Sequence, residues 1–453
     1  MKKLTPPQII VIAFITTILL GTLLLLLPGA HTTGPLTLTD ALFTATSATC
    51  VTGLVVVDTG THFTLFGQLV ILLLIQIGGM GIMTLGTFFI ISIGVRLRWQ
   101  DRDIVTRTLT GERHLDIWGL LRNVFWLTLG IEAAGTILLA GRFLHQHGME
   151  PARAVYNALF HSVSAFCNAG FSLNADSFIA YQTDPVINFI LMLLIIAGGL
   201  GYTVLIDMGT FGPRSRRLTP HRRLTLHSRF TLVFTGILIL GGGILFLALE
   251  AGNTLIDLSW PQKIVGALFQ AVTPRTAGFN TVEIAQASNA ALMLLILLMF
   301  IGGAPGSCAG GIKVTTMGVL LLLARSRIRG LNDVVLFKRR IREKTVAEAM
   351  GIMALGVATV AIFTFLLVIV ETGGQSHAAT EGEFIRLFFE TVSAFGTVGL
   401  STGVTPELST VGRLLITLLM FVGRIGPLTM AIAVAARARR TAFRFVEDKV
   451  MVG

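Results

Sequence analysis

Four short segments of small residues, each ending in glycine, contain the backbone groups of this 453-residue sequence that are best suited to hold a cation. Backbone carbonyl oxygens can replace the hydration shell of an ion, and glycine gives the backbone the freedom to aim them. No acidic side chain accompanies them, which favours a weakly hydrated monovalent cation over calcium. The candidate filter residues are Cys50, Val51, Thr52 and Gly53; Cys167, Asn168, Ala169 and Gly170; Thr276, Ala277 and Gly278; and Gly396, Thr397, Val398 and Gly399.

These glycines have a simpler interpretation, in which they allow helices to pack closely, as is common in membrane proteins. One glycine alone would favour packing, whereas four at equivalent positions favour an ion filter. Arg275 precedes the third segment and would disturb a cation path. We expect its side chain to point away from the path and to brace the loop, for instance against a carboxylate or a helix carboxyl end.

A second candidate is a glycine-rich stretch that cannot form the interior of a continuous helix, because it holds five glycines and a proline within twelve residues. The alternative is a kinked helix that its neighbours support. Lys313, at the inner end, can reach cytoplasmic water. The residues of this candidate gate are Gly302, Gly303, Ala304, Pro305, Gly306, Ser307, Cys308, Ala309, Gly310, Gly311, Ile312 and Lys313, together with Arg424.

Arg424 lies thirteen residues into an apolar segment that begins near Val411, roughly 20 Å along a helix. A charge at that depth is costly, and such residues usually face a cavity or a partner. We expect Arg424 to donate hydrogen bonds to freed carbonyls of residues 302–313 and to bar cations in the resting state. The alternative is a structural ion pair or a carbonyl cap.

Other reactive patterns are sparse. Cys50, Cys167 and Cys308 have no metal-ligand spacing, so neither a zinc site nor a disulfide framework is indicated, and no cofactor is expected on this chain. Gln76 and Glu132 are more simply explained by interhelical hydrogen bonds than by substrate binding. An integral membrane enzyme is disfavoured because no catalytic constellation lies near a span end. An ion-coupled secondary carrier is the nearer alternative, although it needs titratable residues at the bilayer midplane.

The elements that must position these residues are membrane helices. The sequence is 53% hydrophobic and 13% charged, far from ordinary soluble domains. We take the first apolar run as a retained helix rather than a signal peptide. Eight runs approach the length of a membrane span: residues 8–27, 65–95, 124–144, 185–210, 230–251, 290–323, 346–370 and 411–436.

An internal repeat organises these spans. The filter glycines are separated by 117, 108 and 121 residues, and a second glycine landmark follows each at Gly78, Gly198, Gly302 and Gly423. Two spans per repeat return the chain to its starting side, so the repeats are parallel around one axis. The sequence thus predicts an all-α membrane protein of four parallel helix–pore loop–helix repeats around a central pseudo-fourfold pore. The expected repeats cover residues 1–116, 117–229, 230–345 and 346–453.

Each repeat carries a helix too short to cross the bilayer, such as residues 39–48, which hold Asp40 near the amino end. The carboxyl end of such a helix would direct its partial negative charge towards the membrane interior. The third repeat departs from the symmetry, because the stretch from its short helix to Gly278 is one residue shorter near Thr273.

The formal charge of +11 is explained by topology. Basic residues gather near the amino terminus and in residues 96–113, 214–229, 325–344 and 437–449, which all fall on one side. By the positive-inside rule that side is the cytoplasm, with both termini, so the charge indicates lipid headgroups and not nucleic acid as the contact.

Taken together, the motifs resemble the Ktr/Trk/HKT superfamily of potassium transporters, most closely its KtrB-type subunits. The resemblance covers nearly the whole chain and rests on the segments at residues 5–8, 47–58, 164–171, 270–280, 393–400 and 421–428. The two extra amino-terminal spans of the Trk branch are not found, which favours Ktr. The family implies potassium uptake through a filter built around Gly53, Gly170, Gly278 and Gly399, and an intramembrane gating loop at residues 302–313.

The resemblance also implies partners. Ktr-type subunits form homodimers and work with a soluble cytoplasmic ring of nucleotide-binding RCK subunits, similar to KtrA. No glycine-rich phosphate loop precedes a helix in this sequence, so nucleotide control would come from that partner. Sodium activation is common in Ktr systems, but no residue pattern here demonstrates it. The sequence leaves channel-like flux and coupled transport open, and also the sensed nucleotide and the dimer interface.

Overall fold

The computed structural model describes residues 6–32, 34, 36–80, 117–209 and 224–426, and these residues are predominantly helical, which confirms the all-α prediction. The one sheet among them is a hairpin of β1 (Val335–Leu336) and β2 (Arg339–Arg340), in which Val335 pairs with Arg340. The predicted basic segments at residues 96–113 and 437–449 lie outside the described residues, as does most of 214–229.

The helices fall into four similar groups, each with a long helix, a short helix and a further apolar helix. The first holds α1 (Pro6–Leu25), α2 (Leu38–Thr49), α3 (Thr59–His62) and α4 (Leu65–Gly79); the second holds α7 (Ile117–His145), α8 (Pro151–Phe166), η1 (Ile179–Tyr181), α9 (Pro185–Leu200) and α10 (Tyr202–Gly209); the third holds α12 (Leu226–Glu250), α13 (Trp260–Val272), η2 (Ile284–Gln286), α14 (Asn289–Phe300) and α15 (Val314–Ile328); the fourth holds α16 (Glu343–Thr372), η3 (His377–Thr380), α17 (Glu383–Gly396), η4 (Thr405–Glu407) and α18 (Thr410–Ile425).

The long first helices have the length and composition of membrane spans: residues 8–25, 122–145, 226–250 and 343–372. The further helices are shorter or broken. Residues 185–210 were predicted as one span, but α9 and α10 meet at an angle of 104°. The break lies at Gly201, whose φ of 84° is a conformation that a helix cannot continue through. The predicted spans 65–95 and 411–436 extend beyond the described residues.

Two predicted repeat boundaries fall inside helices. α12 begins at Leu226 and α16 at Glu343, a few residues before the expected starts at 230 and 346. The polar and basic residues just before the predicted starts were assigned to loops, but they continue the helical turn, because Lys, Arg and Glu are good helix formers.

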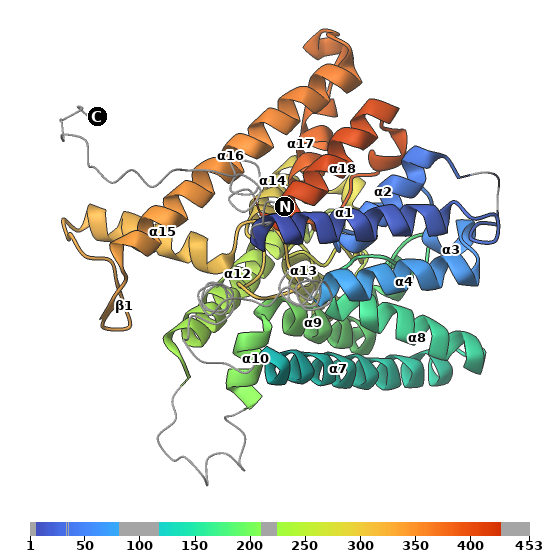
Figure 1. Ribbon diagram of the computed structural model, residues 1–453, viewed down its shortest axis with the longest axis horizontal. Coiled ribbons are helices and arrows are strands. Elements are labelled where there is room, and N and C mark those ends of the chain that lie inside the picture. The colour runs from blue at the N-terminus through green and yellow to red at the C-terminus, as the bar shows by residue number, and fades with distance from the viewer. Residues whose placement is uncertain (1–5, 33, 35, 81–116, 210–223, 427–453) are drawn as a thin grey trace, which may run out of the picture.

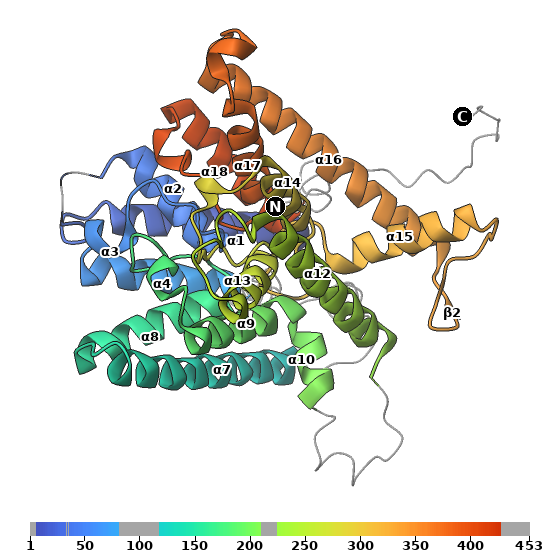
Figure 2. The ribbon, with the colours of Figure 1, turned by 180° about the vertical axis from the view of Figure 1, so that it is seen from behind.

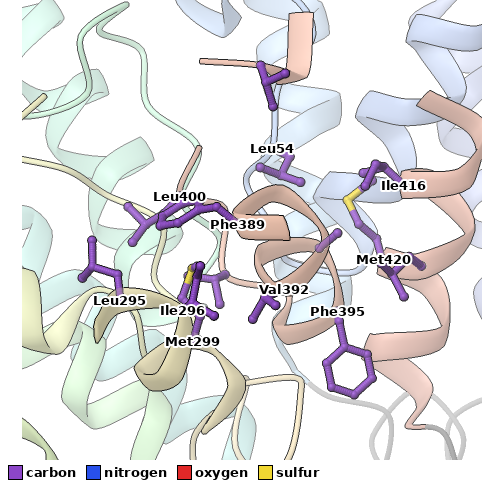
Figure 3. Close-up of a cluster of buried hydrophobic side chains, with 14 of the residues drawn as sticks. Leu54, Leu295, Ile296, Met299, Phe389, Val392, Phe395, Leu400, Ile416 and Met420 are labelled. Carbon is purple, nitrogen blue, oxygen red and sulfur yellow. The ribbon is translucent and has the colours of Figure 1, made fainter. Parts of the chain in front are cut away.

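Packing between repeats, rather than burial from water, holds such a bundle together, because lipid is as apolar as the side chains themselves. A buried apolar cluster joins the fourth repeat to the first and third (Figure 3). Phe389 and Phe395 on α17 lie there with Met299 on α14, Met420 on α18 and Leu54 of the first glycine segment. The cluster surrounds the end of α17 and fixes the place where its glycine segment begins.

Viewed as a ribbon, α7 and α8 run side by side along one edge of the bundle (Figure 1). α15 and α16, with the β1–β2 hairpin between them, project away from the rest, as both views show (Figure 2). The short helices α2, α13 and α17 lie within the bundle, so the segments that follow them meet in its interior.

Candidate functional site

Four short helices lead into the predicted glycine segments. α2, α8, α13 and α17 each end beside one of them, so the partial negative charge of each carboxyl end lies next to that segment. At the amino end of α2, Thr37 accepts a hydrogen bond from the Asp40 N–H, and a capping box of Ser259 and Gln262 begins α13. The helix predicted at residues 39–48 is therefore present as α2.

Each glycine segment repeats the same backbone conformation. The terminal glycines have positive φ, from 70° at Gly170 to 96° at Gly53. L residues rarely adopt positive φ, and its recurrence indicates that the direction of the carbonyls is what the fold specifies. The residue two positions before each glycine is also left-handed: Val51 at 57°, Asn168 at 59°, Thr276 at 77° and Thr397 at 50°.

The third segment keeps this conformation despite its missing residue. α13 ends at Val272, and a tight turn through Pro274 brings the chain to Thr276 with the same left-handed backbone. The missing residue changes the backbone only before Thr276. Thr276 and Gly278 therefore have the same conformation as the equivalent residues of the other three segments.

The four segments meet in a closed ring. A β-carbon on Gly53 would lie 2.5 Å from the Ala169 oxygen, and one on Gly170 would lie 2.9 Å from the Ala277 oxygen. In the same way, Gly278 faces the Val398 carbonyl, and Gly399 faces that of Thr52. Each glycine thus abuts the carbonyl that precedes the next one. No side chain could be accommodated at these contacts without displacing the neighbouring glycine segment.

The carbonyl oxygens of the two residues before each terminal glycine are unpaired. None of the described residues donates a hydrogen bond to them, although all of the residues that carry them are buried. An unpaired buried carbonyl costs about 1–3 kcal/mol, and such groups are rare in native structures. Bound cations would compensate for these oxygens, which belong to Val51, Thr52, Asn168, Ala169, Thr276, Ala277, Thr397 and Val398.

A hydroxyl near the end of each short helix holds its segment in place, a feature that the sequence interpretation missed. Ser47 accepts from the Gly53 N–H at 3.1 Å, and Ser393 accepts from the Gly399 N–H at 3.2 Å. Ser164 donates to the Phe171 carbonyl at 2.7 Å, and Thr273 donates to that of Phe279 at 2.5 Å. The recurrence of Ser or Thr five or six residues before each glycine was the signal that could have identified them.

A cavity of about 220 Å³ opens directly on one side of the ring. All four terminal glycines line it, together with polar residues that follow them, including Ser172, Asn280 and Ser401. An ion entering from this side would meet hydroxyl and amide groups before it reached the carbonyls.

The second glycine landmark also has a structural role. A β-carbon on Gly78 would strike the Thr49 carbonyl, and one on Gly423 would strike that of Phe395. Gly198 approaches the Phe166 carbonyl in the same way. In these three repeats the landmark allows the further helix to pack against the carboxyl end of its own short helix, which brings those helix ends close to the axis.

Residues 302–313, called the gate loop from here on, interrupt the helix between α14 and α15. The Gly302 N–H donates to the Ile312 carbonyl at 2.9 Å, which closes the loop on itself. The Ala304 N–H donates to the Gly199 carbonyl at 2.9 Å, so the loop rests on α9. A β-carbon on Gly311 would lie 3.1 Å from the α-carbon of Gly396, so the loop also lies against the fourth glycine segment. The predicted interruption is confirmed, whereas gating stays a prediction.

Arg424 is buried and donates from Nη1 to the Cys308 carbonyl of the gate loop and from Nη2 to the Gly78 carbonyl at 2.5 Å. The expected contact with a freed loop carbonyl is therefore present. The guanidinium joins the first, third and fourth repeats, and neither Arg424 nor its two partners line the cavity.

Two charged side chains have partners that the sequence did not specify. Lys313 does not extend away from the loop, because its ammonium donates to the Ala309 carbonyl at 2.5 Å and so satisfies a carbonyl that the broken helix leaves free. Arg275 turns to Thr235 on α12, with Nη2 donating to the hydroxyl at 3.2 Å. Its partner is a hydroxyl and not the carboxylate or helix end offered as examples.

The remaining polar predictions concern packing. The Gln76 amide donates to the Glu132 carboxylate at 3.1 Å between α4 and α7, as the interhelical interpretation predicts. Cys50, Cys167 and Cys308 are buried free thiols. Within the described ranges, no group of three His, Cys, Asp or Glu residues could hold a metal ion.

Residues 4–441 match the family model of TrkH, described as a cation transport protein. The chain is 39% identical to Ktr system potassium uptake protein B of Bacillus subtilis, covering 100% of this chain and 97% of that protein. It is 36% identical to the potassium/sodium uptake protein NtpJ of Enterococcus hirae, covering 100% and 98%. The potassium transporter TrkH of Vibrio parahaemolyticus has a similar fold, with a TM-score of 0.72 at 20% identity over 98% of this chain and 86% of that one.

Proposed function

Because this chain belongs to the TrkH family of cation transport proteins, we propose that it takes up potassium through one central pore whose selectivity filter is the ring of four glycine segments. Membership agrees with the Ktr/Trk resemblance of its motifs, and it makes the chain a membrane transporter and not an enzyme. The observation that carries the proposal is the set of buried, unpaired carbonyl oxygens in the ring.

Neutral carbonyls suit potassium better than more strongly hydrated ions, since they must replace the hydration shell without a full negative charge. The four left-handed residues and four glycines aim these oxygens inward, and each segment abuts the next. Relatives named for potassium uptake and for potassium/sodium uptake support the same class of substrate. The cavity of about 220 Å³ is then the outer vestibule.

The gate loop and Arg424 together form the barrier below the filter. We infer that this charge and the irregular backbone lie on the far side of the ring from the vestibule, because the loop contacts Gly396 before the fourth glycine, whereas the vestibule is lined by Gly399 and the residues after it. A guanidinium at that position repels an approaching cation, and low dielectric surroundings strengthen the effect. Opening the path requires the loop to leave Arg424 or both to move together.

The proposed setting is the cytoplasmic membrane, with both termini and the basic segments in the cytoplasm. There the chain forms a homodimer and contacts a ring of RCK subunits, which supply the nucleotide response. Sodium is a candidate activator.

The deciding experiment is tracer uptake into proteoliposomes, comparing potassium with sodium, with and without a candidate RCK protein. Potassium uptake down its own gradient supports the pore. Uptake that depends strictly on an imposed proton or sodium gradient would favour the ion-coupled carrier, and uptake of neither ion would contradict the proposed function.

A further inference from the structure

A buried polar residue occupies the same position of each short helix, one turn or more before the filter. These residues stand nine positions before the terminal glycine in the first, second and fourth repeats and eight before it in the third, where the segment is one residue shorter. Polar groups at membrane depth are costly unless they have partners. They are Thr44, His161, Gln270 and Glu390, all at most 2% exposed.

His161 is bonded at both ring nitrogens. Nε2 accepts from the Leu173 N–H at 3.2 Å and lies 3.0 Å from the Ser172 hydroxyl. Because Nε2 accepts from a backbone N–H, the proton is assigned to Nδ1, which donates to the Asn157 carbonyl at 2.8 Å. The neutral imidazole therefore ties α8 to the chain two and three residues beyond Gly170.

Glu390 has the same relation to the fourth repeat. The Thr405 hydroxyl donates to Glu390 Oε1 and lies 3.1 Å from the Ser401 hydroxyl. In the third repeat, Gln270 donates to the Thr281 hydroxyl at 3.3 Å. Each of these side chains thus reaches from the short helix to the segment that leaves the glycine ring.

The partners of His161 and Glu390 form part of the vestibule wall. Ser172, Ser401 and Thr405 all line the cavity that opens on the glycines. The first repeat differs, because the Thr44 hydroxyl has no hydrogen-bond partner among the described residues. In the second and fourth repeats, the short helix therefore holds the vestibule wall through a side-chain hydrogen bond. In the first repeat, Thr44 makes no such bond.

We propose that His161 and Glu390 are positioning residues for ion preference, which hold the segments that leave the glycine ring and so set the width of the ring at its vestibule side. This inference rests on the proposed function. Ser47 and Ser393 fix the ring at the glycine nitrogens, whereas His161 and Glu390 hold the departing segments two to six residues after the terminal glycine.

A structural role and a positioning role make different predictions for conservative variants. Glu390→Gln keeps an oxygen that can accept from Thr405, and His161→Gln keeps one that can accept from the Leu173 N–H. Glu390→Leu and His161→Leu remove these acceptors. Thr44→Val is the matched control, since it changes the equivalent position where no hydroxyl partner exists.

The measurement is the ratio of potassium to sodium uptake in proteoliposomes at equal protein content. We expect the leucine variants to lower this ratio about fivefold. This is the change in ratio that corresponds to the free energy of one hydrogen bond, if that energy is lost for bound potassium and not for bound sodium. The glutamine variants should stay within about twofold of the wild type, and Thr44→Val should match it.

Leucine variants that fold and keep the wild-type ratio would overturn the positioning role. If they do not fold, Thr405→Val removes the contact of Glu390 from the vestibule side and Ser172→Ala removes one of the two contacts of His161 Nε2, and an unchanged ratio in both would overturn the positioning role equally. A wild-type protein that takes up neither ion would overturn the proposed function, and the positioning role with it, before any variant is compared.

Discussion

The guanidinium of Arg413 on α18 lies 2.6 Å from the carboxylate of Asp40 on α2, a contact between residues 373 positions apart. Arg413 also donates to the Pro406 carbonyl at 2.8 Å. The pair joins the last repeat to the first, so it closes the ring of repeats near its outer rim. Both side chains are largely buried, at 23% and 12% exposure, which separates this pair from ordinary surface ion pairs.

Breaking this pair should destabilise the fold. We expect a double-mutant cycle with Asp40→Asn and Arg413→Gln to give a coupling free energy of about 1–2 kcal/mol in denaturant titrations in mild detergent. The matched control is Arg386 with Glu407, of which Glu407 is 64% exposed, and its coupling should stay below about 0.5 kcal/mol. Equal coupling in the two cycles would mean that ring closure does not depend on Asp40.

Selectivity should depend on Gly53. A β-carbon there would lie 2.5 Å from the Ala169 oxygen, and the φ of 96° is unfavourable for any L residue. Gly53→Ser should therefore raise sodium uptake relative to potassium in a strain that lacks its own potassium transporters. Gly252→Ser is the control, because nothing lies within 4 Å of its added β-carbon. A normally expressed Gly53→Ser protein with unchanged ion preference would count against the first segment as part of the filter.

Basal flux should rise when the barrier below the filter is weakened. Arg424→Ala removes the donor to the Cys308 carbonyl, and shortening residues 304–309 removes its acceptor. Each change should raise basal potassium flux, and the combined variant should add little, since both remove one barrier. If the single variants fold but lose transport, or if their effects add, Arg424 is a structural brace.

Stability should fall in acid because of Asp184, which lies before α9 outside the spanning helices. Burial alone would raise the pKa of Asp184, but hydrogen bonds from Arg142 at 2.8 Å and His147 at 3.0 Å, with two backbone N–H groups, hold that pKa below its usual value. The ionised carboxylate therefore stabilises the fold at neutral pH, and this contribution is lost as the pH falls below about 4.

The measurement is the unfolding midpoint of wild type and Asp184→Asn between pH 7 and pH 3. The free energy of unfolding of the variant should be lower at pH 7, because the neutral amide loses the ion pair with Arg142, and it should fall less on acidification. Parallel curves for the two proteins would show that Asp184 does not contribute to the acid sensitivity.

Assembly should involve the projecting arm formed by residues 325–344. Residues 325–344 carry eight basic side chains, and the β1–β2 hairpin extends away from the bundle with Val335 exposed (Figure 2). We expect this arm to contact a partner ring and a second copy of the chain, with the carboxyl tail that lies outside the described residues. Mass measurement in mild detergent should give a dimer, and a monomer with full nucleotide-responsive transport would remove the idea.

The sequence by itself determined the class of protein and the position of the four glycine segments. Apolar runs, basic clusters and a glycine landmark are local patterns, and four copies in the same order fix which residues are equivalent. Gly53, Gly170, Gly278 and Gly399 could therefore be aligned without any contact being known, and residues 302–313 could be identified as a break because glycine and proline act within one helix turn.

Only the tertiary structure decided which groups touch across repeats. The closure of the ring, the contact of Arg424 with Gly78, and the pairing of Asp40 with Arg413 join residues far apart in sequence, whereas a contact of Arg424 with a carbonyl of residues 302–313 was predicted. The break at Gly201 and the turn of Lys313 back onto the gate loop were also decided there. Such contacts depend on how helices pack around an axis, and no local pattern of residue types encodes the partner of a carbonyl or a guanidinium in another repeat.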